Sequence, residues 1–409
     1  MTVPSMKDDE VEGGAVAPVL NGNRPLSGVK VLDLSQILAG PYCTRLLADA
    51  GAEVTKIEPP SGDPSRHLPP LIDEDHSGYF LWLNCGKRSV VADLRTAEGR
   101  ELVRALASEA DVLVENMRPG SLEAKGLGYE SLKLLNPRLV MCSISAFGNT
   151  GAFAGRPGQG IVAEGWSGAI DMNGAIDGPP LPLGISLADV SAGIHAYAAI
   201  VTALYRRDRT NGPGDYLDVS LFEAALPFHE TALEEVALGG GEISPTRNGA
   251  EHRSVVPYGV FDAPDGYLVI AAGTERLWQR LAEVLTAVLG PTDTDLSTNE
   301  LRLIHRTEVR ERIERWAQRL GSRDRALEAL GAAGVPCGPI QQTKDVQGSE
   351  LAVSRGAFVH IPDPVLGRVS VLNTPYKTSN STIGPAGPAP RLGEHTAEVL
   401  AELAGTAVT

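Results

Sequence analysis

The chain has 409 residues, of which 43% are hydrophobic, and its formal net charge is −15. A chain of this length can bury a large core and is typical of two or three domains. The acidic balance argues against a nucleic-acid-binding protein, although a pocket with a few local cations can still bind an anionic ligand.

The cysteines and the N-terminal residues give no signal for a metal, a disulfide or export. Cys43, Cys85, Cys142 and Cys337 are far apart and form no CxxC pair, so neither a metal site nor a disulfide framework is predicted. A reducing cytoplasm is the simplest location. Residues 1–24 lack the regions of a signal peptide and are expected to form a flexible tail. The sequence contains no long run of apolar residues, so no membrane span is predicted.

Short β-rich runs alternate with helical patterns from Pro25 to about residue 224. The expected strands are 29–34, 52–57, 88–93, 112–115 and 139–145, and the expected helices are 41–50, 96–110 and 122–135. This alternation predicts an α/β fold, with a Rossmann-like large domain over 25–224 that is built on a parallel sheet.

The stretch 148–182 is rich in glycine and proline and is expected to be a long loop with a short helix at about 161–167. Loops of this kind often carry the functional site in α/β folds. A long apolar helix is expected to follow, ending near Arg207, and a turn, a strand and a helix start come after it.

A second, smaller α+β domain is predicted over 225–340. A hairpin pattern at 258–272 precedes three amphipathic patterns at 274–285, 306–320 and 322–334. Residues 341–409 show strand patterns from Phe358 and a helix at about 394–403, and we expect this segment to return to the large domain.

The motifs of several nucleotide-using and hydrolytic enzymes are missing. The first strand–helix turn reads SQILAGPY, which lacks the glycine fingerprint of dinucleotide-binding proteins. The chain also contains no P-loop, no G-x-S-x-G and no HExxH motif. A nicotinamide-dependent dehydrogenase is therefore disfavoured.

Asp189 stands where the glycine-rich loop turns into the long apolar helix. An aspartate there can cap the helix by accepting free backbone N–H groups of the first turn. It can also be a nucleophile that the positive helix end keeps ionised. Local chemistry favours the cap, because capping aspartates are much commoner.

Nine segments resemble family III CoA-transferases, the group of formyl-CoA transferase and carnitine CoA-transferase in the CaiB/BaiF-like superfamily. In chain order they are PLSGVKVLDLSQILAGPYCTRLLADAGAEVTKIEPPSGDPSR, NCGKRSVVADLRTAEGR, VLVENMRPGSLEAKGLGY, NPRLVMCSISAFGNTG, RPGQGIVAEGWSG, ISLADVSAG, VPYGVFDAPDGYLVIAAGTERLWQRL, AAGVPCGPI and PRLGEHTAEVL. The resemblance runs from Pro25 to Leu400, and the order and spacing of the segments are specific for the superfamily.

The resemblance implies an enzyme that moves CoA from an acyl-CoA thioester to a free carboxylic acid. Asp189, in SLADVSAG, matches the catalytic aspartate, which would form an aspartyl anhydride and then an aspartyl-CoA thioester; this favours catalysis over a simple cap, and both roles can hold together. CoA and acyl-CoA are then substrates, with no tightly bound cofactor and no metal. The family fold further implies an interlocked homodimer.

Other matched positions imply contacts with CoA and with the acyl group. The matched CoA-binding residues are Leu38, Ala39, Ala92, Arg95, Asn116, Met117 and Arg118, and the nearby Lys125 can join Arg95 and Arg118 in binding phosphates. Many relatives have an arginine at the position of Pro59, and Arg66 is a candidate to compensate. The loop that closes over the aspartate in the family corresponds to 246–254, where Asn248 and Gly249 provide flexibility.

Two other functions stay open. An α-methylacyl-CoA racemase would need a histidine where this chain has Gln159, and Gly160 replaces the usual acidic residue, so this reading is disfavoured. Gln159 can instead bind an acyl carboxylate or be structural. Glu164, in the same segment, is a second carboxylate besides Asp189 that is a candidate for the site. His195 is expected to be structural. A non-catalytic CoA-binding protein is the other alternative. The acyl donor and acceptor are not specified, and a dicarboxylate such as succinate is suggested only by its frequency in the family.

Overall fold

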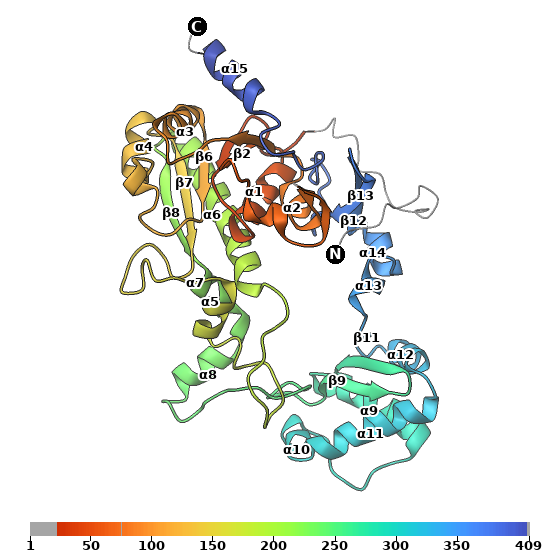
Figure 1. Ribbon diagram of the computed structural model, residues 1–409. Coiled ribbons are helices and arrows are strands. Elements are labelled where there is room, and N and C mark those ends of the chain that lie inside the picture. Colours follow the sequence, from red (N-terminus) through yellow and green to blue (C-terminus); the bar gives the residue numbers. More distant parts are fainter. Residues whose placement is uncertain (1–22, 75, 407–409) are drawn as a thin grey trace. The chain divides into compact units, whose positions relative to one another are not determined.

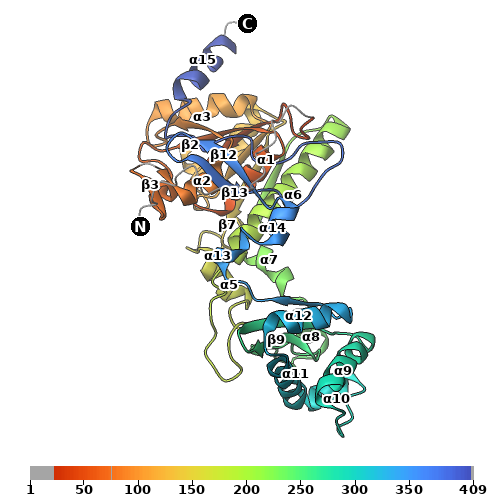
Figure 2. The same cartoon turned by 90° about the vertical axis from the view of Figure 1, so that its right-hand side faces the viewer.

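The computed structural model describes residues 23–74 and 76–406, which form two compact units (Figures 1 and 2). The first unit comprises the described residues up to Ala169, then Leu183–Thr231 and the residues from Gln347 onward; the second comprises Ile170–Pro182 and Ala232–Val346. The predicted tail, 1–24, falls almost entirely outside the described residues.

A six-stranded, fully parallel sheet forms the centre of the first unit, which confirms the predicted α/β fold. In spatial order its strands are β5 (Arg88–Val91), β2 (Glu53–Glu58), β1 (Lys30–Asp33), β6 (Val112–Glu115), β7 (Val140–Ser145) and β8 (Asp215–Ser220). From β1 the chain builds outward through β2 to β5, and then crosses to the other side of β1 to add β6, β7 and β8. Strands β1 and β6 therefore flank a topological switch point, where ligands of open α/β sheets bind at the carboxyl ends of the strands.

Helices cover both faces of this sheet, as the alternation of its buried side chains requires. Val31 and Val112 face a core formed with α1 (Ala39–Asp49) and α6 (Leu187–Thr210). Leu32 and Leu113 face the opposite core, formed with α3 (Ala97–Glu109) and α4 (Tyr129–Leu135). Leu127, Met141 and Val399 belong to the same second core.

Helix α6 is the one helix in the described part of the chain that is long and apolar enough, by length and composition, to cross a membrane. Its residues Ala192, Ala196 and Ile200 are fully buried in the core of the first unit. The core helix of a soluble protein passes the same test. We therefore interpret α6 as the core helix of the unit, and the absence of a membrane span stays a prediction.

Several predicted elements have different bounds in the structure. The predicted helix 122–135 is wrong in its first half, because Gly126 adopts a left-handed φ of 68° and α4 begins only at Tyr129. Sequence analysis also missed α2 (Gly78–Asn84) and the short hairpin of β3 (Leu71–Asp73) and β4 (His76–Ser77). The two strands are too short to show an alternation, and the continuous apolar run of α2 shows no helical period.

The C-terminal segment contains α14 (Glu350–Arg355), an antiparallel hairpin of β12 (Phe358–Asp363) and β13 (Gly367–Leu372), and α15 (Thr396–Thr406). The hairpin shares a small apolar core with α2, in which Phe80 and Leu81 are buried. Residues from 347 onward thus pack within the first unit. Two shorter helices of the unit, α5 (Gly160–Ser167) and α7 (Leu221–Ala225), lie beside α6.

The second unit is an α+β structure built on a three-stranded antiparallel sheet in the order β11 (Cys337–Pro339), β10 (Gly266–Ala271), β9 (Tyr258–Ala263). Its helices are α8 (Ala232–Leu238), α9 (Glu275–Leu289), α10 (Asn299–Ile304), α11 (Arg306–Leu320), α12 (Arg323–Ala332) and α13 (Thr343–Val346).

The second unit differs at its edges from the predicted domain 225–340, because it runs from Ala232 to Val346 and also takes in Ile170–Pro182. The Arg247 side chain holds that extra segment through the Asp171 carboxylate at 2.6 Å and the Gly178 carbonyl at 2.7 Å. These contacts join residues about 70 positions apart, which no local pattern indicates.

Candidate active site

Asp189 is the third residue of α6, so the interpretation of Asp189 as the helix cap is wrong. The N-cap position belongs to Ser186, whose side chain makes no capping hydrogen bond. In the first turn, the Asp189 carboxylate still lies at the positive end of the helix dipole, which favours its ionised form.

A second helix begins against the same carboxylate. Gly160 is the first residue of α5, and a Cβ atom built on it would lie 2.0 Å from Oδ2 of Asp189. No side chain fits between the two, so only glycine allows the N-terminus of α5 to approach the aspartate this closely. The contact also gives a physical reason for Gly160 in the place of an acidic residue.

Burial and a neighbouring charge raise the pKa of Asp189 to about 6. The neighbouring charge is Glu164 of α5, which is buried and whose Oε1 accepts a hydrogen bond from the backbone N–H of Ala188 at 3.1 Å. Among the described residues, no hydrogen bond or ion pair engages the Asp189 carboxylate. The group is therefore mostly ionised at neutral pH, partly buried and unpaired, as a nucleophile requires.

Two adjoining cavities lie near the switch point. The first, which we call the β2 cavity, has a volume of about 700 Å³ and is lined by four predicted CoA-binding residues, Ala92, Arg95, Met117 and Lys125. The second, the Phe147 cavity, has about 500 Å³ and is lined by Asn116, Met117, Arg118 and Gln159 among the predicted residues. Met117 lines both cavities, so they meet at the end of β6.

Most charged groups of the β2 cavity are already paired. Lys56 Nζ lies 2.9 Å from the Asp63 carboxylate, and the exposed Arg95 guanidinium lies 2.7 Å from Asp93. Lys125 donates only to the backbone and hydroxyl oxygens of Ser121, at 3.0 and 3.1 Å. Among the predicted phosphate-binding residues that line this cavity, Lys125 is therefore the one without an acidic partner in the described chain.

The expectation that Arg66 compensates for Pro59 is wrong. Arg66 is fully buried and binds the Glu58 carboxylate through two of its nitrogens, each at 2.7 Å. Its guanidinium also lies 3.7 Å from the ring centroid of Phe80. A guanidinium held in this way inside the unit does not reach a phosphate, whereas Pro59 itself lines the β2 cavity.

The turn between β1 and α1 is held by side chains from β2, from the segment that follows β2 and from the residue that follows β6. Asn116 Nδ2 donates to the Gln36 carbonyl and its Oδ1 accepts from the Gln36 N–H, both at 2.8 Å. Lys56 donates to the Ser35 carbonyl at 2.7 Å, and the Ile37 N–H donates to Asp63 at 3.2 Å. Asn116 is thus engaged with the turn rather than open to a ligand.

This turn adopts an unusual conformation just before two predicted CoA-binding residues. Ile37 has a left-handed φ of 67°, which is costly for a β-branched residue. Leu38 follows as the residue before α1, and Ala39 is the buried first residue of that helix. The side chains that hold the turn therefore fix where Leu38 and Ala39 lie.

A fully buried charge pair lies beneath the turn. Asp33 Oδ2 accepts hydrogen bonds from Lys87 Nζ at 3.0 Å and from Thr44 at 2.7 Å. Burial alone would raise the pKa of Asp33, but the charges of Lys87 and Lys56 and the hydrogen bonds outweigh it and hold that pKa well below its usual range. Burial also lowers the pKa of Lys87, to about 8.

The remaining predicted residues lie elsewhere. Gln159 is exposed and precedes α5 without a capping bond, and His195 is on an exposed part of α6, with Nδ1 2.9 Å from the Ser191 carbonyl oxygen. Asn248 and Gly249 belong to the second unit, where Asn248 donates to the Glu251 carbonyl and Gly249 has a φ of 67°. Closure of their loop over Asp189 stays a prediction.

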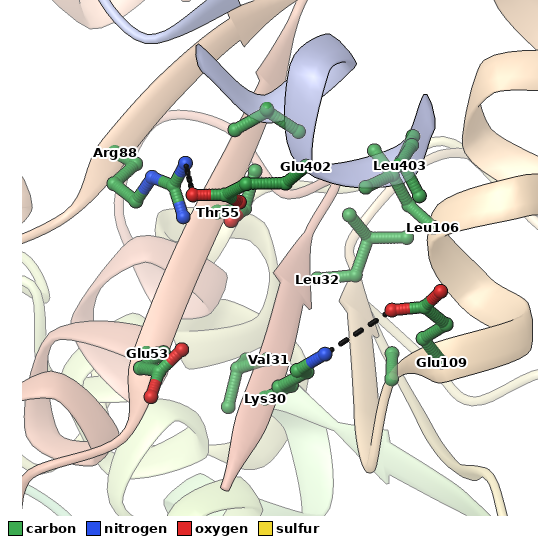
Figure 3. A pocket seen from close by; sticks show the side chains of 12 residues that line it. Lys30, Val31, Leu32, Glu53, Thr55, Arg88, Leu106, Glu109, Glu402 and Leu403 are labelled. Carbon is green, nitrogen blue, oxygen red and sulfur yellow. Dashed lines mark hydrogen bonds and ion pairs between the residues drawn. The ribbon is translucent and has the colours of Figure 1, made fainter. Parts of the chain in front are cut away.

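A third cavity, of about 280 Å³, lies between α15 and the sheet (Figure 3). Figure 3 shows its cations paired with carboxylates, Lys30 with Glu109 at 3.1 Å and Arg88 with Glu402 at 2.9 Å. None of the predicted site residues lines it, and we assign it no functional role.

Sequence analysis missed three residues of the site region. Lys56 is a fully buried charged residue inside β2, and a lysine within a predicted strand can be recognised in the sequence. Arg156 lies in the glycine-rich loop, and its guanidinium contacts the rings of Phe153 and Trp166. Burial and the charges of Asp189 and Asp63 raise the pKa of Tyr79. The proximity of Tyr79 to Asp189 has no signal in the sequence, because 110 residues separate the two.

Comparison with known proteins gives one family. The model described as CoA-transferase family III matches residues 26–396. The succinate–glutarate CoA-transferase of Agrobacterium fabrum is 36% identical, over 94% of this chain and 96% of the relative. The succinyl-CoA:mesaconate CoA-transferase of Haloarcula hispanica is 35% identical, over 92% and 96%. The crystal structure of a CaiB/BaiF family protein from Brucella suis superposes with a TM-score of 0.83 and 38% identity, over 93% of this chain and 100% of that one.

Proposed function

Because the chain belongs to CoA-transferase family III, we propose that it moves CoA from an acyl-CoA to a free carboxylic acid with Asp189 as the nucleophile. The observation that supports this role is the unpaired, partly buried carboxylate at the first turns of both α5 and α6. A carboxylate with a pKa of about 6 is more basic than an ordinary aspartate and is still ionised at neutral pH.

In the first half-reaction, an Asp189 oxygen attacks the thioester carbonyl and the CoA thiolate leaves, which gives a mixed anhydride. The thiolate then attacks the aspartyl carbonyl, the donor acid departs as its carboxylate, and an aspartyl-CoA thioester remains. The acceptor carboxylate attacks this thioester and expels the thiolate. The thiolate attacks the acyl carbonyl of the new anhydride, which yields the new acyl-CoA and the free Asp189 carboxylate.

In the first turn of α6, the N–H groups of Leu187 and Ala188 already donate to the Ile185 carbonyl and to Glu164. The first turn of α5 is better suited to this chemistry, because the first backbone N–H groups of a helix have no partners within it. Such groups stabilise the oxyanions of tetrahedral intermediates. The CoA phosphates would bind where the β2 cavity presents Lys125, and the adjoining Arg118 would contribute a second cation. Arg95 would have to exchange its contact with Asp93 for one with the phosphate.

We further propose that the acyl groups are dicarboxylic. The two enzymes compared above are named for succinate and glutarate and for succinyl-CoA and mesaconate. A screen of acyl-CoA donors against carboxylic acids, read by mass spectrometry, tests this choice. Efficient transfer restricted to monocarboxylic acids would refute it.

The covalent route is tested by intact-mass spectrometry of the protein after mixing with succinyl-CoA. We expect an adduct with the mass of CoA, and inactivation when hydroxylamine is present with the donor. Asp189→Asn is the control, because it should bind CoA and form no adduct. Transfer without any adduct would refute the mechanism, whereas CoA binding without transfer would favour the non-catalytic alternative. Exchange of the α-hydrogen in deuterated water would instead favour the racemase.

An interlocked homodimer also stays a proposal, because it concerns a second copy of the chain. Analytical ultracentrifugation during mild denaturation tests it. Since two linked chains cannot separate while folded, dissociation should coincide with unfolding. A folded monomer in equilibrium with a dimer would contradict the linked arrangement.

A further inference from the structure

The Phe147 cavity contains a charge that the proposed mechanism does not use. Its lining includes two guanidinium groups, Arg118 and Arg156, and no aspartate or glutamate. The nearby carboxylate of Asp218 already accepts the backbone and side-chain N–H groups of Asn149, at 2.8 to 3.0 Å. In a chain with a net charge of −15, such a cavity is a local site for an anion.

Aromatic rings hold the guanidinium of Arg156 in place. Its central carbon lies 5.2 Å from the ring centroid of Phe153 and 5.2 Å from that of Trp166. The two rings contact each other edge to face at 5.0 Å, and Phe147 packs against both. Arg156 and the two rings are exposed, so the stacking favours one orientation of the guanidinium without burying it, and this lowers part of the entropy lost on binding.

The hydrogen-bond donors of Arg156 are not used by the protein. Across residues 23–74 and 76–406, its guanidinium makes no hydrogen bond and no ion pair. A guanidinium has five N–H donors in a fork that matches the two oxygens of a carboxylate. By contrast, Arg247 satisfies its guanidinium with the Asp171 carboxylate and a backbone carbonyl.

The cavity ends one residue away from the Asp189 contact. Gly158 and Gln159 line the cavity, and the next residue, Gly160, touches the carboxylate of Asp189. The four peptide steps from Arg156 to Gly160 span at most roughly 14 Å even when fully extended. The proposal below places the reacting end of an acyl group at Asp189 and its far end in this cavity, which Phe153 and Arg156 both line.

We propose that Arg156 binds the far carboxylate of a dicarboxylic acyl group and so makes the enzyme prefer dicarboxylic over monocarboxylic substrates. This inference rests on the proposed CoA transfer and adds the residue that recognises the far end of the acyl group. The same cation could in principle meet a CoA phosphate, and the experiment below separates the two ligands.

The test compares succinyl-CoA with butyryl-CoA, which has the same number of acyl carbons and lacks the far carboxylate. The measured quantity is the single-turnover rate of aspartyl-CoA formation, which needs no acceptor acid. In Arg156→Met, we expect the rate with succinyl-CoA to fall by roughly 10- to 100-fold, because a charge-assisted hydrogen-bonded pair is lost. The rate with butyryl-CoA should change less than about twofold, and Arg156→Lys should restore part of the preference. Arg209→Met, at an exposed arginine of α6, is the matched control and should leave both rates unchanged.

Other outcomes would overturn the inference. An equal loss with both donors would assign Arg156 to CoA, and no loss with either would make it a surface arginine stacked on rings. Dissociation constants of the two thioesters, measured in Asp189→Asn with and without Arg156→Met, do not depend on adduct formation. If Asp189 forms no adduct, these constants still decide the role of Arg156, so the failure of the mechanism is distinguishable from the failure of this inference.

Discussion

Two regions of the first unit gather charged side chains, and they treat those charges in opposite ways. Beneath the turn between β1 and α1, Asp33, Lys56, Asp63 and Lys87 are almost fully buried, and each lies within 3.0 Å of an oppositely charged partner. At the first turns of α5 and α6, Asp189 has no partner within the described residues.

The difference separates charges that shape the protein from charges that are available to a substrate. A buried pair is costly to break, so the network beneath the turn fixes the backbone around Ile37. An unpaired carboxylate keeps its cost of burial, which appears as the raised pKa of Asp189. The buried charge of Asp189 thus lowers the stability of the folded protein and leaves a carboxylate that is free to react with a substrate.

The sharpest test replaces one aspartate in each region by asparagine and compares the free energies of unfolding at pH 7. Asp33→Asn leaves Lys87 buried without its counter-charge and should destabilise the protein by about 3–5 kcal/mol. Asp189→Asn removes a disfavoured charge and should stabilise it by about 1–2 kcal/mol, allowing for solvent screening. Urea unfolding followed by circular dichroism measures both.

The two effects have different pH windows. The folded pKa of Asp33 is lowered, so its contribution exists above the usual value of 3.8 and is lost as the pH falls below it. The folded pKa of Asp189 is raised to about 6, so the gain in Asp189→Asn is full above pH 6 and vanishes below 3.8. If both substitutions changed the free energy of unfolding in the same direction, the contrast between the two regions would be refuted.

The next largest effect is expected from Gly160→Ala. The new methyl group would lie 2.0 Å from Oδ2 of Asp189, so either the carboxylate or the start of α5 must move. A displacement of about 1 Å in a reacting group can cost about 100-fold in rate. Gly331→Ala, in a helix of the second unit with no atom near the added methyl, is the control and should leave the rate unchanged. Full activity of Gly160→Ala in the aspartyl-CoA assay would contradict the close contact.

The pH dependence of the first half-reaction should be set by Asp189. Because the attacking group is the ionised carboxylate, the rate should be constant above pH 7 and fall about tenfold per unit below pH 6. Single-turnover rates between pH 4.5 and 8 would measure this profile, within the range where circular dichroism shows the protein folded. A midpoint near pH 4 would mean that Asp189 has the pKa of an exposed aspartate.

The fold was largely predictable from the sequence, because strands and helices of the parallel sheet carry complete apolar patterns. The exception at 122–135 arose because Gly126 interrupts a helical pattern with a left-handed residue. The site was predictable only in part. Asp189 was found by resemblance, but its contact with Gly160 and the pairing of Lys87 with Asp33 join residues 29 and 54 positions apart. Such contacts depend on how the elements pack.

A smaller effect is expected from Asn116→Ala, which removes both hydrogen bonds to the Gln36 backbone. At about 1 kcal/mol net for each bond, the dissociation constant for CoA should rise roughly 10- to 30-fold. If Asn116 acts by holding the turn, the KM for acyl-CoA should change more than kcat. Titration calorimetry and steady-state kinetics measure these quantities, and an unchanged affinity would mean that the remaining contacts suffice to hold the turn.

The smallest effect is expected from Ile37→Gly, and it separates a held turn from a direct CoA contact. Glycine adopts the φ of 67° without steric cost but gains freedom when unfolded, so the stability should change by less than about 1 kcal/mol. In the Asn116→Ala background, isoleucine is free to relax to a negative φ, whereas glycine still visits the native conformation. The double variant should therefore bind CoA several-fold more tightly than Asn116→Ala alone. If Asn116 instead contacted CoA directly, glycine at position 37 would restore nothing.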